Sequence, residues 1–230
     1  IMIFKCKKIK DKIIPNTLYA VYYKDSKEPV HFVEKQDEDG SEAFIDIKYT
    51  LKEGQYGIFA NEYHPSHVTD AKRADLLLLI VDEKQKAWAS WVLDVKVTVG
   101  GKDVITHLIE QWQETYIHKK MFSIYLDGFT EAETIGVVTR EYQGERIQTM
   151  VEALGRDIAN ITESVALMPK SPVVIDQQRR LLGMRLEYQM LEQFKNGYVT
   201  IENKTYAIKV YQLEGDESPY CGGIEVKLEQ

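Results

Sequence analysis

The clearest hydrophobic pattern lies in the middle of the chain, where two apolar runs flank a short charged turn. Residues 74–81 (ADLLLLIV) are apolar apart from one aspartate, residues 82–86 are mostly charged, and residues 87–99 (AWASWVLDVKVTV) are again rich in Trp and Val. An apolar run of this length, closely bounded by turn residues, is typical of a strand that is buried on both faces. The pattern predicts two adjacent strands at the centre of a sheet. A buried helix is the rival interpretation of residues 76–81, but the short run and its charged flanks favour a strand.

A helix and a further strand are predicted after this pair. Two glycines end the second strand, Asp103 stands where a helix N-cap is expected, and residues 104–120 carry apolar side chains at helical spacing. Residues 134–139 (TIGVVT) have the pattern of another buried strand, and residues 145–163 have that of a second helix. The order strand, strand, helix, strand, with helices following, predicts an α/β fold with a three-layer α/β/α core and a mixed central sheet.

The two ends of the chain carry shorter patterns. Near the N-terminus, residues 30–34 and 43–50 flank an acidic turn that contains glycine, which indicates a hairpin. Towards the other end, residues 175–195 have the pattern of a long helix, which an Asn-Gly pair ends. A second hairpin is expected to follow, formed by residues 198–201 and 205–211 around a turn at Asn203-Lys204 and lying outside the core.

These patterns predict one domain over residues 1–230. Its core is expected over about residues 54–165, with an N-terminal β extension at 1–53 and a C-terminal extension of a helix and a hairpin at 166–230.

The chain is acidic, with a net charge of −7 and a pI of about 5.4. Proteins that bind nucleic acid through their overall charge are usually basic. The sequence therefore argues against that mode of binding, but leaves open a local basic strip or a metal-mediated contact with phosphate.

Two further counts bear on location. Two cysteines make neither a disulfide framework nor a zinc cluster, which indicates a reducing, cytoplasmic setting. The longest apolar run, residues 76–81, is far shorter than the ~20 residues of a membrane-spanning helix. The N-terminal residues also lack a signal-peptide pattern, so no membrane contact is expected.

Two carboxylates and one ammonium are expected to converge at one end of the central strand pair. If the turn centres between Lys84 and Gln85, cross-strand partners have numbers that sum to a constant, and Asp75 faces Asp94. Directly opposed residues have Cβ atoms about 5 Å apart. Lys96 lies two residues beyond Asp94 and so shares its face.

This grouping suits metal-assisted hydrolysis of a phosphodiester. Opposed carboxylates repel each other unless a cation neutralises them, and Mg²⁺ (or Mn²⁺) binds one or two carboxylates while keeping water ligands. The backbone carbonyl of Val95 would add an oxygen ligand to Asp75 and Asp94. Lys96 would hold or help to deprotonate the attacking water and would stabilise negative charge that develops on the phosphate.

At these residues the chain resembles the PD-(D/E)XK nuclease superfamily. In that family an Asp enters one core strand and an (Asp/Glu)-x-Lys triplet lies in the next, followed by a helix and another strand. The matching positions are Asp75, Asp94-Val95-Lys96, residues 104–120 and residues 134–139. The resemblance covers about residues 60–140, and Ala74 stands where the family name has Pro.

The resemblance implies a restriction-endonuclease-like fold and a metal-dependent nuclease acting on nucleic acid, with DNA as the expected substrate. It implies that Asp75 and Asp94 hold the metal and that Lys96 is the catalytic lysine. It also suggests a role in restriction, repair or defence against phage. Many members place a Glu ahead of the first Asp, for which Glu62 is the nearest candidate. Gln111, on the helix that follows, is a further residue that could reach the site.

Alternatives remain open at this point. The (Asp/Glu)-x-Lys triplet is common in this chain, and Asp46-Ile47-Lys48, with Glu34 expected opposite Asp46, is the main competitor. Asp94 and Lys96 could also be an exposed ion pair at a strand end. For function, the alternatives are an RNA substrate, or an inactive nuclease-fold subunit that binds a protein partner or forms a homo-oligomer.

Overall fold

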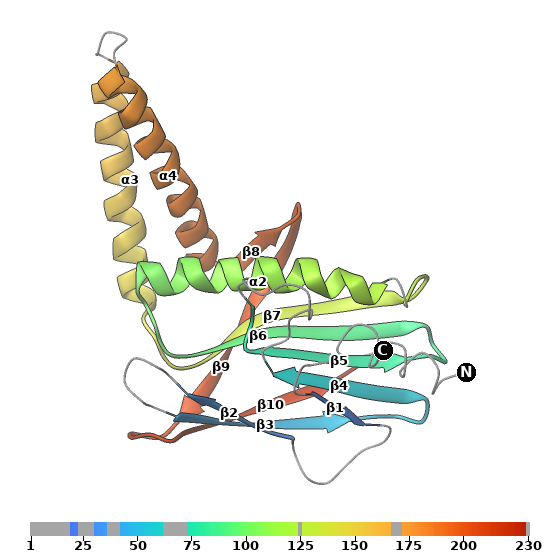
Figure 1. Cartoon of the computed structure of the whole chain (residues 1–230). Helices are drawn as coiled ribbons and strands as arrows, with labels where there is room; N and C mark the ends of the chain where they lie inside the picture. Colours follow the sequence, from blue (N-terminus) through green and yellow to red (C-terminus); the bar gives the residue numbers. More distant parts are fainter. Residues whose placement is uncertain are drawn as a thin grey trace.

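The computed structural model describes residues 19–22, 30–35, 42–61, 73–123, 126–166 and 172–228. They form a mixed α/β protein in which a strongly curled sheet makes a half-barrel (Figure 1). In chain order the elements are β1 (Tyr19–Tyr22), β2 (Val30–Lys35), β3 (Glu42–Thr50), β4 (Gln55–Asn61), β5 (Leu76–Asp82), β6 (Ala87–Val99), α2 (Lys102–Ser123), β7 (Thr130–Tyr142), α3 (Gly144–Ala166), α4 (Pro172–Lys195), β8 (Tyr198–Ile201), β9 (Lys204–Glu214) and β10 (Tyr220–Lys227).

The sheet runs through nine strands in the order β1-β4-β5-β6-β7-β9-β10-β3-β2, and β8 pairs with β9 beside this path. The strands β4, β5 and β6 form an antiparallel meander. Helix α2 then crosses over to β7, which pairs parallel with β6. The predicted strand, strand, helix, strand order of the middle of the chain is therefore confirmed.

The register of the central hairpin also agrees with the prediction. Leu76 pairs with Leu93 and Asp82 pairs with Ala87, so the partner numbers sum to 169 and the turn centres between Lys84 and Gln85. Asp82 fixes this turn, because its side chain accepts hydrogen bonds from the backbone N–H groups of Lys84 and Gln85, each at 2.9 Å.

The alternation of side chains along β5 shows what covers each face of the sheet. Leu77 and Leu79 pack in one core cluster with α2 residues such as Leu108. Leu78 and Ile80 pack in a second cluster with residues of β3 and β10. Because β10 pairs parallel with β3 and the sheet curls, its own strands cover the face opposite α2.

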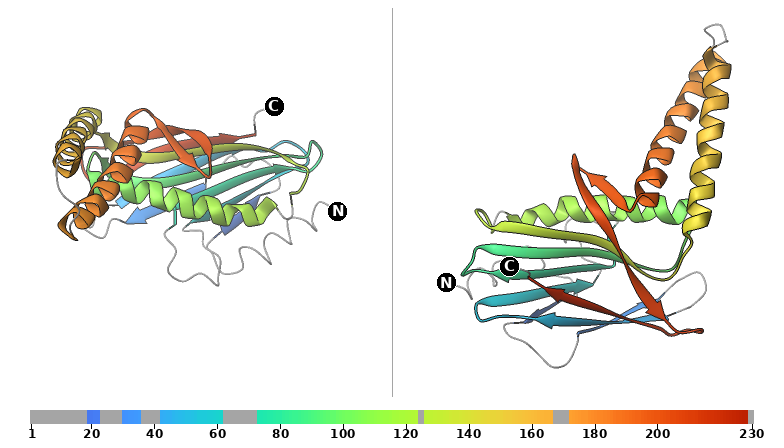
Figure 2. Two further views of the ribbon diagram at one scale, coloured as in Figure 1. Left: turned by 90° about the horizontal axis from the view of Figure 1, so that it is seen from above. Right: turned by 180° about the vertical axis from the view of Figure 1, so that it is seen from behind.

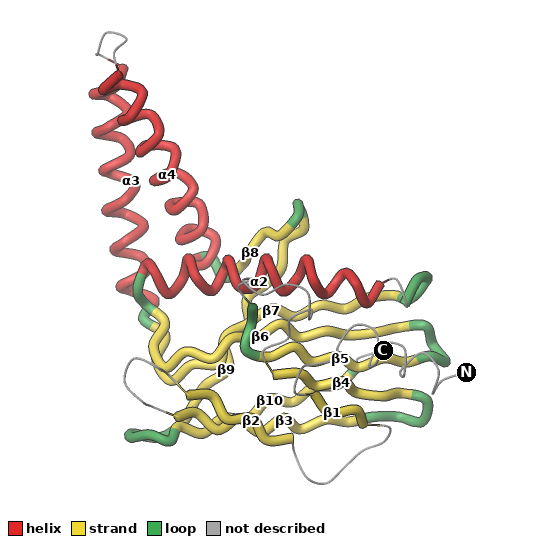
Figure 3. Tube along the Cα trace, in the orientation of Figure 1, coloured by secondary structure: helices red, strands yellow, loops and turns green. Residues whose placement is uncertain are grey.

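The expected three-layer core is therefore wrong in one layer. Helix α2 covers one face of the sheet, but among the described residues the other face is covered by strands (Figures 1 and 3). The expected second helical layer is absent there because α3 and α4 pack against each other and project from the sheet (Figure 2). We call this pair of helices, residues 144–166 and 172–195, the arm.

The two predicted hairpins are present. β2 and β3 pair antiparallel, and β8 and β9 pair antiparallel after α4 ends at Lys195. The turn of the second hairpin is Glu202-Asn203, one residue before the expected Asn203-Lys204 turn, because Lys204 pairs with Ile201. The positive φ angles of 47° and 67° at Glu202 and Asn203 suit a two-residue hairpin turn. The expectation that this hairpin lies outside the core is wrong, because β9 continues alongside β7 as a strand of the main sheet. None of the helices in the described ranges combines the length and the apolar character needed to cross a membrane.

A buried ionic network holds the C-terminal half of α2 to the sheet. The ammonium of Lys119, which is 2% exposed, donates to Ser90 (3.0 Å), Glu131 (2.7 Å) and Glu133 (2.5 Å). Lys204 of β9 also donates to Glu133 at 2.5 Å. Burial alone would raise the pKa of Glu133, but the charge and hydrogen bonds of Lys119 and the bond from Lys204 lower it to about 2. The stability from Glu133 is therefore complete above its ordinary pKa of 4.5 and is lost as the pH falls towards 2.

Lys119→Met should lower the free energy of unfolding by about 3–5 kcal/mol, because it leaves Glu133, whose side chain is 3% exposed, and the half-buried Glu131 without their main partner. Denaturant unfolding near neutral pH measures the change. Lys84→Met is the matched control, because Lys84 pairs with Glu53 on the exposed surface and should cost little. A Lys119→Met protein as stable as wild type would show that the network does not anchor α2.

Candidate active site

Asp75, Asp94 and Lys96 come together at one end of the central hairpin. Asp75 directly precedes β5, and continuing the β5–β6 register places it opposite Asp94. Asp94 and Lys96 share the face of β6 that looks towards α2, as alternation from Val92 predicts. The Nζ atom of Lys96 lies 3.4 Å from Oδ2 of Asp75. The convergence predicted from the sequence is therefore present.

Asp94 is a fully buried carboxylate. Its exposed fraction is 0%, and neither of its oxygens has a hydrogen-bond partner within the described ranges. Burial, and next the negative charge of Asp75, raise its pKa well above the ordinary value, while the charge of Lys96, the side chain of Trp112 and the backbone of Asp75 oppose the rise. The alternative of an exposed strand-end ion pair is wrong, because such a pair needs a solvated carboxylate.

Asp75 is tied to the opposite strand. Its Oδ2 accepts the backbone N–H of Val95 at 2.7 Å and also faces the ammonium of Lys96. Val95 therefore contacts Asp75 through its backbone N–H, whereas its carbonyl was the group expected to bind a metal. This bond fixes the carboxylate of Asp75 over the strand that carries Asp94.

Lys96 is held in its charged form. Burial would lower the pKa of its ammonium, but the negative charges of Asp75 and Asp94 outweigh burial and raise it. The charge of Glu34, from β2, contributes in the same direction. Glu34 was not expected near this site, because the sequence pattern placed it in a separate hairpin.

Helix α2 fixes the chain just before Asp75. The side chain of Gln111 donates to the carbonyl of Arg73 at 2.7 Å, and the hydroxyl of Thr115 accepts the N–H of Ala74 at 2.7 Å. Gln111 thus supports the site through the backbone, and its own Oε1 is buried without a hydrogen-bond partner in the described part of the chain. Sequence reasoning missed Thr115, although its spacing of four residues from Gln111 places both on one helix face.

The other candidates fall elsewhere. Glu62 lies outside the described residues. Asp46 of the competing triplet stands opposite His31, not Glu34 as expected, and its Oδ1 is 2.6 Å from Nδ1 of the His31 ring. Both side chains of that pair are exposed, so the competing triplet belongs to a solvated hairpin and not to a buried site.

Among the described residues, Asp75 and Asp94 are the carboxylates that the site offers to a metal ion. Within the described ranges, no group of three or more His, Cys, Asp or Glu residues could hold a metal ion. Two carboxylates and water are nevertheless a donor set that Mg²⁺ accepts.

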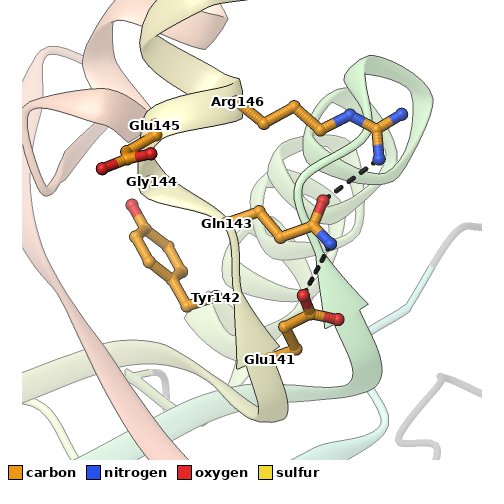
Figure 4. Close-up of a pocket in the computed structure, with 6 residues that line it drawn as sticks. All are labelled: Glu141, Tyr142, Gln143, Gly144, Glu145 and Arg146. Carbon is orange, nitrogen blue, oxygen red and sulfur yellow. Dashed lines mark hydrogen bonds between the residues drawn. The ribbon is translucent and has the colours of Figure 1, made fainter.

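A surface depression of about 570 Å³ lies at the junction of β7 and α3 (Figure 4). In it, Gln143 donates to Glu141 and accepts from Arg146. The hydroxyl of Thr98, two residues beyond Lys96, contacts Glu141 at 3.4 Å. The depression therefore lies beyond the end of the strand that carries Lys96, and none of the predicted site residues lines it.

No family model, curated protein or solved structure matches this chain. The geometry and electrostatics of Asp75, Asp94 and Lys96 are therefore the basis for assigning a function.

Asp94→Asn should stabilise the metal-free protein near neutral pH by on the order of 1–2 kcal/mol, as replacement of a strained site residue can. Because the pKa of Asp94 is raised, the wild-type fold loses stability as the pH rises through that value, and asparagine removes this loss. Thermal unfolding in the presence of a chelator, followed against pH, measures the effect. The difference in stability between wild type and Asp94→Asn should vanish at pH values well below the ordinary aspartate pKa of 3.8.

Asp82→Asn is the matched control, since it changes the same residue type at the other end of β5. Asp82 is buried but fully hydrogen-bonded, to Gln55 at 3.0 Å and to two backbone N–H groups. Its replacement should destabilise by about 1–3 kcal/mol. If Asp94→Asn and Asp82→Asn destabilise equally, Asp94 is not an unsatisfied charge.

Proposed function

We propose that this chain is a metal-dependent nuclease that hydrolyses phosphodiester bonds, with DNA as its substrate. The observation that carries the proposal is Asp94, a fully buried carboxylate without a hydrogen-bond partner in the described ranges, opposite a second carboxylate. A protein interior tolerates such a group only if it is protonated or if a cation neutralises it. A divalent cation between Asp75 and Asp94 meets that requirement.

The donor set suits Mg²⁺ or Mn²⁺. Two carboxylates on adjacent strands leave the remaining positions of the ion to water and to a phosphate oxygen. The Val95 carbonyl and Glu62 remain proposed as additional ligands. When bound, the ion would supply Lewis-acid stabilisation of the phosphate and an activated water.

Lys96 has the properties that the chemistry needs beside the acidic pair. Its ammonium is charged because Asp75 and Asp94 raise its pKa, and Asp75 holds it at 3.4 Å. From there it can orient the attacking water and stabilise the negative charge that develops on the phosphate. Asp75 thus has two roles, as a metal ligand and as the group that positions Lys96.

The topology around the site supports the resemblance to the PD-(D/E)XK superfamily. The acidic residues lie on successive antiparallel strands, and α2 then leads to the parallel strand β7, in the order that the resemblance implies. The face opposite α2 differs from the three-layer α/β/α arrangement, because strands cover it. The proposed kinship is therefore with the catalytic half of that fold.

The second candidate function is a nuclease-fold subunit that acts as a scaffold without cleaving. Two observations favour it. The described site has only two acidic ligands, and the arm carries large exposed apolar side chains, including Leu182 and Leu186. Metal-dependent cleavage by the purified protein separates the two functions.

Wild-type protein should cleave plasmid or single-stranded DNA in the presence of Mg²⁺ or Mn²⁺ and not in the presence of a chelator. Lys96→Ala should lower the cleavage rate by about 10²–10³, because it removes one donor to the developing charge. Asp94→Asn should in addition raise the Mg²⁺ concentration needed for half-maximal cleavage. RNA in the same assay tests the alternative substrate.

Lys48→Ala is the matched control for Lys96→Ala. Lys48 is the lysine of the competing Asp46-Ile47-Lys48 triplet, which lies on an exposed hairpin. It should cleave as wild type does. If Lys96→Ala cleaves at the wild-type rate, the assigned site is wrong. If wild type cleaves no nucleic acid with any divalent metal, the scaffold function replaces the enzyme.

Metal affinity should fall as the pH falls, and the fall should begin above the ordinary carboxylate pKa of 3.8, because Asp94 holds its proton more tightly than usual. Titration calorimetry with Mn²⁺ at a series of pH values measures this change. A Mn²⁺ affinity that stays constant down to pH 4 would contradict Asp94 as a ligand.

A further inference from the structure

The indole N–H of Trp112 is a buried hydrogen-bond donor for which the described part of the chain provides no bonded acceptor. Trp112 lies in the middle of α2 and is 0% exposed. Its ring belongs to the core cluster that also contains Val92 of β6. Indole has one polar group, a donor, and protein interiors rarely leave such a group without an acceptor. An acceptor for this N–H is therefore expected close by.

Asp94 is the complementary group on the facing strand. Both of its oxygens are buried and lack hydrogen-bond partners in the described ranges. It shares the face of β6 with Val92, which is the face that packs against Trp112 and its neighbours on α2. Burial is the largest influence on the pKa of Asp94 and raises it, and the side chain of Trp112 acts in the opposite direction, as a hydrogen-bond donor does. A donor without an acceptor thus faces an acceptor without a donor across the interface between α2 and β6.

The core holds the ring of Trp112 in place from another side. The ring stacks on Phe194 of α4, with centroids 6.1 Å apart and an angle of 11° between the planes. Phe194 is 1% exposed and also stacks on Tyr142 at the end of β7, with centroids 6.1 Å apart. Stacked rings gain from this specific geometry, so the stack restricts rotation of the indole and fixes the direction of its N–H.

We propose that Trp112 is a positioning residue for Asp94, whose one carboxylate oxygen accepts the indole N–H while the other oxygen binds the metal ion. The role towards the metal rests on the proposed function, whereas the contact between the two side chains does not. An ionised carboxylate accepts several hydrogen bonds, so this donor does not compete with the ion. Hydrogen bonds in active sites often reach full strength only once the ligand is bound, and this one is expected to shorten when Asp94 carries its charge.

The same turn of α2 also positions the second carboxylate. Gln111 and Thr115, on either side of Trp112 in the sequence, bind the backbone directly ahead of Asp75. One helical turn therefore fixes the backbone that carries Asp75 and the side chain of Asp94. It thereby sets the separation of the two proposed metal ligands.

Heteronuclear NMR of the indole N–H groups tests the contact in the presence of a chelator. The chain has three tryptophans, and the indole peak that remains in both Trp88→Phe and Trp91→Phe is that of Trp112. Asp94→Asn should shift the Trp112 peak and leave the Trp88 peak in place. Trp88 is a suitable reference, because it lies in the same core cluster but beside Lys119. A Trp112 peak that does not move in Asp94→Asn would overturn the proposal.

Titration calorimetry with Mn²⁺ tests the positioning role. Trp112→Phe keeps an aromatic ring beside Phe194 but removes the N–H, and should weaken Mn²⁺ binding by about 10–100-fold, as loss of a group that supports a metal ligand typically does. Trp88→Phe removes the same atoms from the same core cluster. It is the matched control and should bind Mn²⁺ as wild type does.

Two calorimetric results would overturn the positioning role. One is a Trp112→Phe protein that binds Mn²⁺ as tightly as wild type. The other is an equal loss of Mn²⁺ affinity in Trp112→Phe and Trp88→Phe, because the effect would then come from the core in general. If wild type binds no Mn²⁺ while Asp94→Asn still moves the Trp112 peak, the metal site and the proposed function fail, whereas the contact between Trp112 and Asp94 stands.

Discussion

The pairing register of β5 and β6 is the constraint on which the candidate site depends. Side chains alternate between faces, so a slip of one residue would turn Asp94 and Lys96 away from α2 and into the second core cluster. Asp82 locks the register at the turn, through hydrogen bonds to two backbone N–H groups and to Gln55. The hydrogen-bonded carboxylate of Asp82 at the turn thus determines the position of Asp94 at the other end of the hairpin, where the carboxylate has no hydrogen-bond partner in the described ranges.

The interface between α2 and β6 contains two charged clusters. In one of them the charges are paired, and in the other a buried carboxylate has no hydrogen-bond partner in the described ranges. Near the C-terminal end of α2, Lys119 satisfies Glu131 and Glu133 and also lies 5.3 Å from the ring of Trp88. Near the middle of the helix, Trp112 and Gln111 face the region of Asp94, whose charge has no hydrogen-bond partner in the described ranges. The Lys119 network holds the helix to the sheet. That anchoring lets the other cluster keep an unfavourable charge arrangement without loss of the fold, as functional sites commonly do.

Features of the fold and of the candidate site were predictable from the sequence where the interacting residues lie close together along the chain. The β5–β6 register and the shared face of Asp94 and Lys96 follow from alternation and from one charged turn, all within about 20 residues. The continuous run at 76–81 correctly indicated burial on both faces but contained no information on what covers each face. The covering strands pair Ala43 with Tyr220, and no local pattern reports a contact between residues so far apart. Similarly, the helical spacing placed Gln111 and Thr115 on one face but did not show that they bind the backbone ahead of Asp75.

The net charge of −7 limits how an acidic protein can hold a polyanion. At the site itself, two aspartates and one lysine sum to a charge of −1, which repels phosphate. A divalent cation changes that sum to +1 and so reverses the sign of the local field. Under the proposed function the metal is therefore required for the substrate to approach as well as for the chemistry. The unusual burial of Asp94 serves both needs, since a carboxylate that water cannot solvate gains more from a cation than an exposed one does.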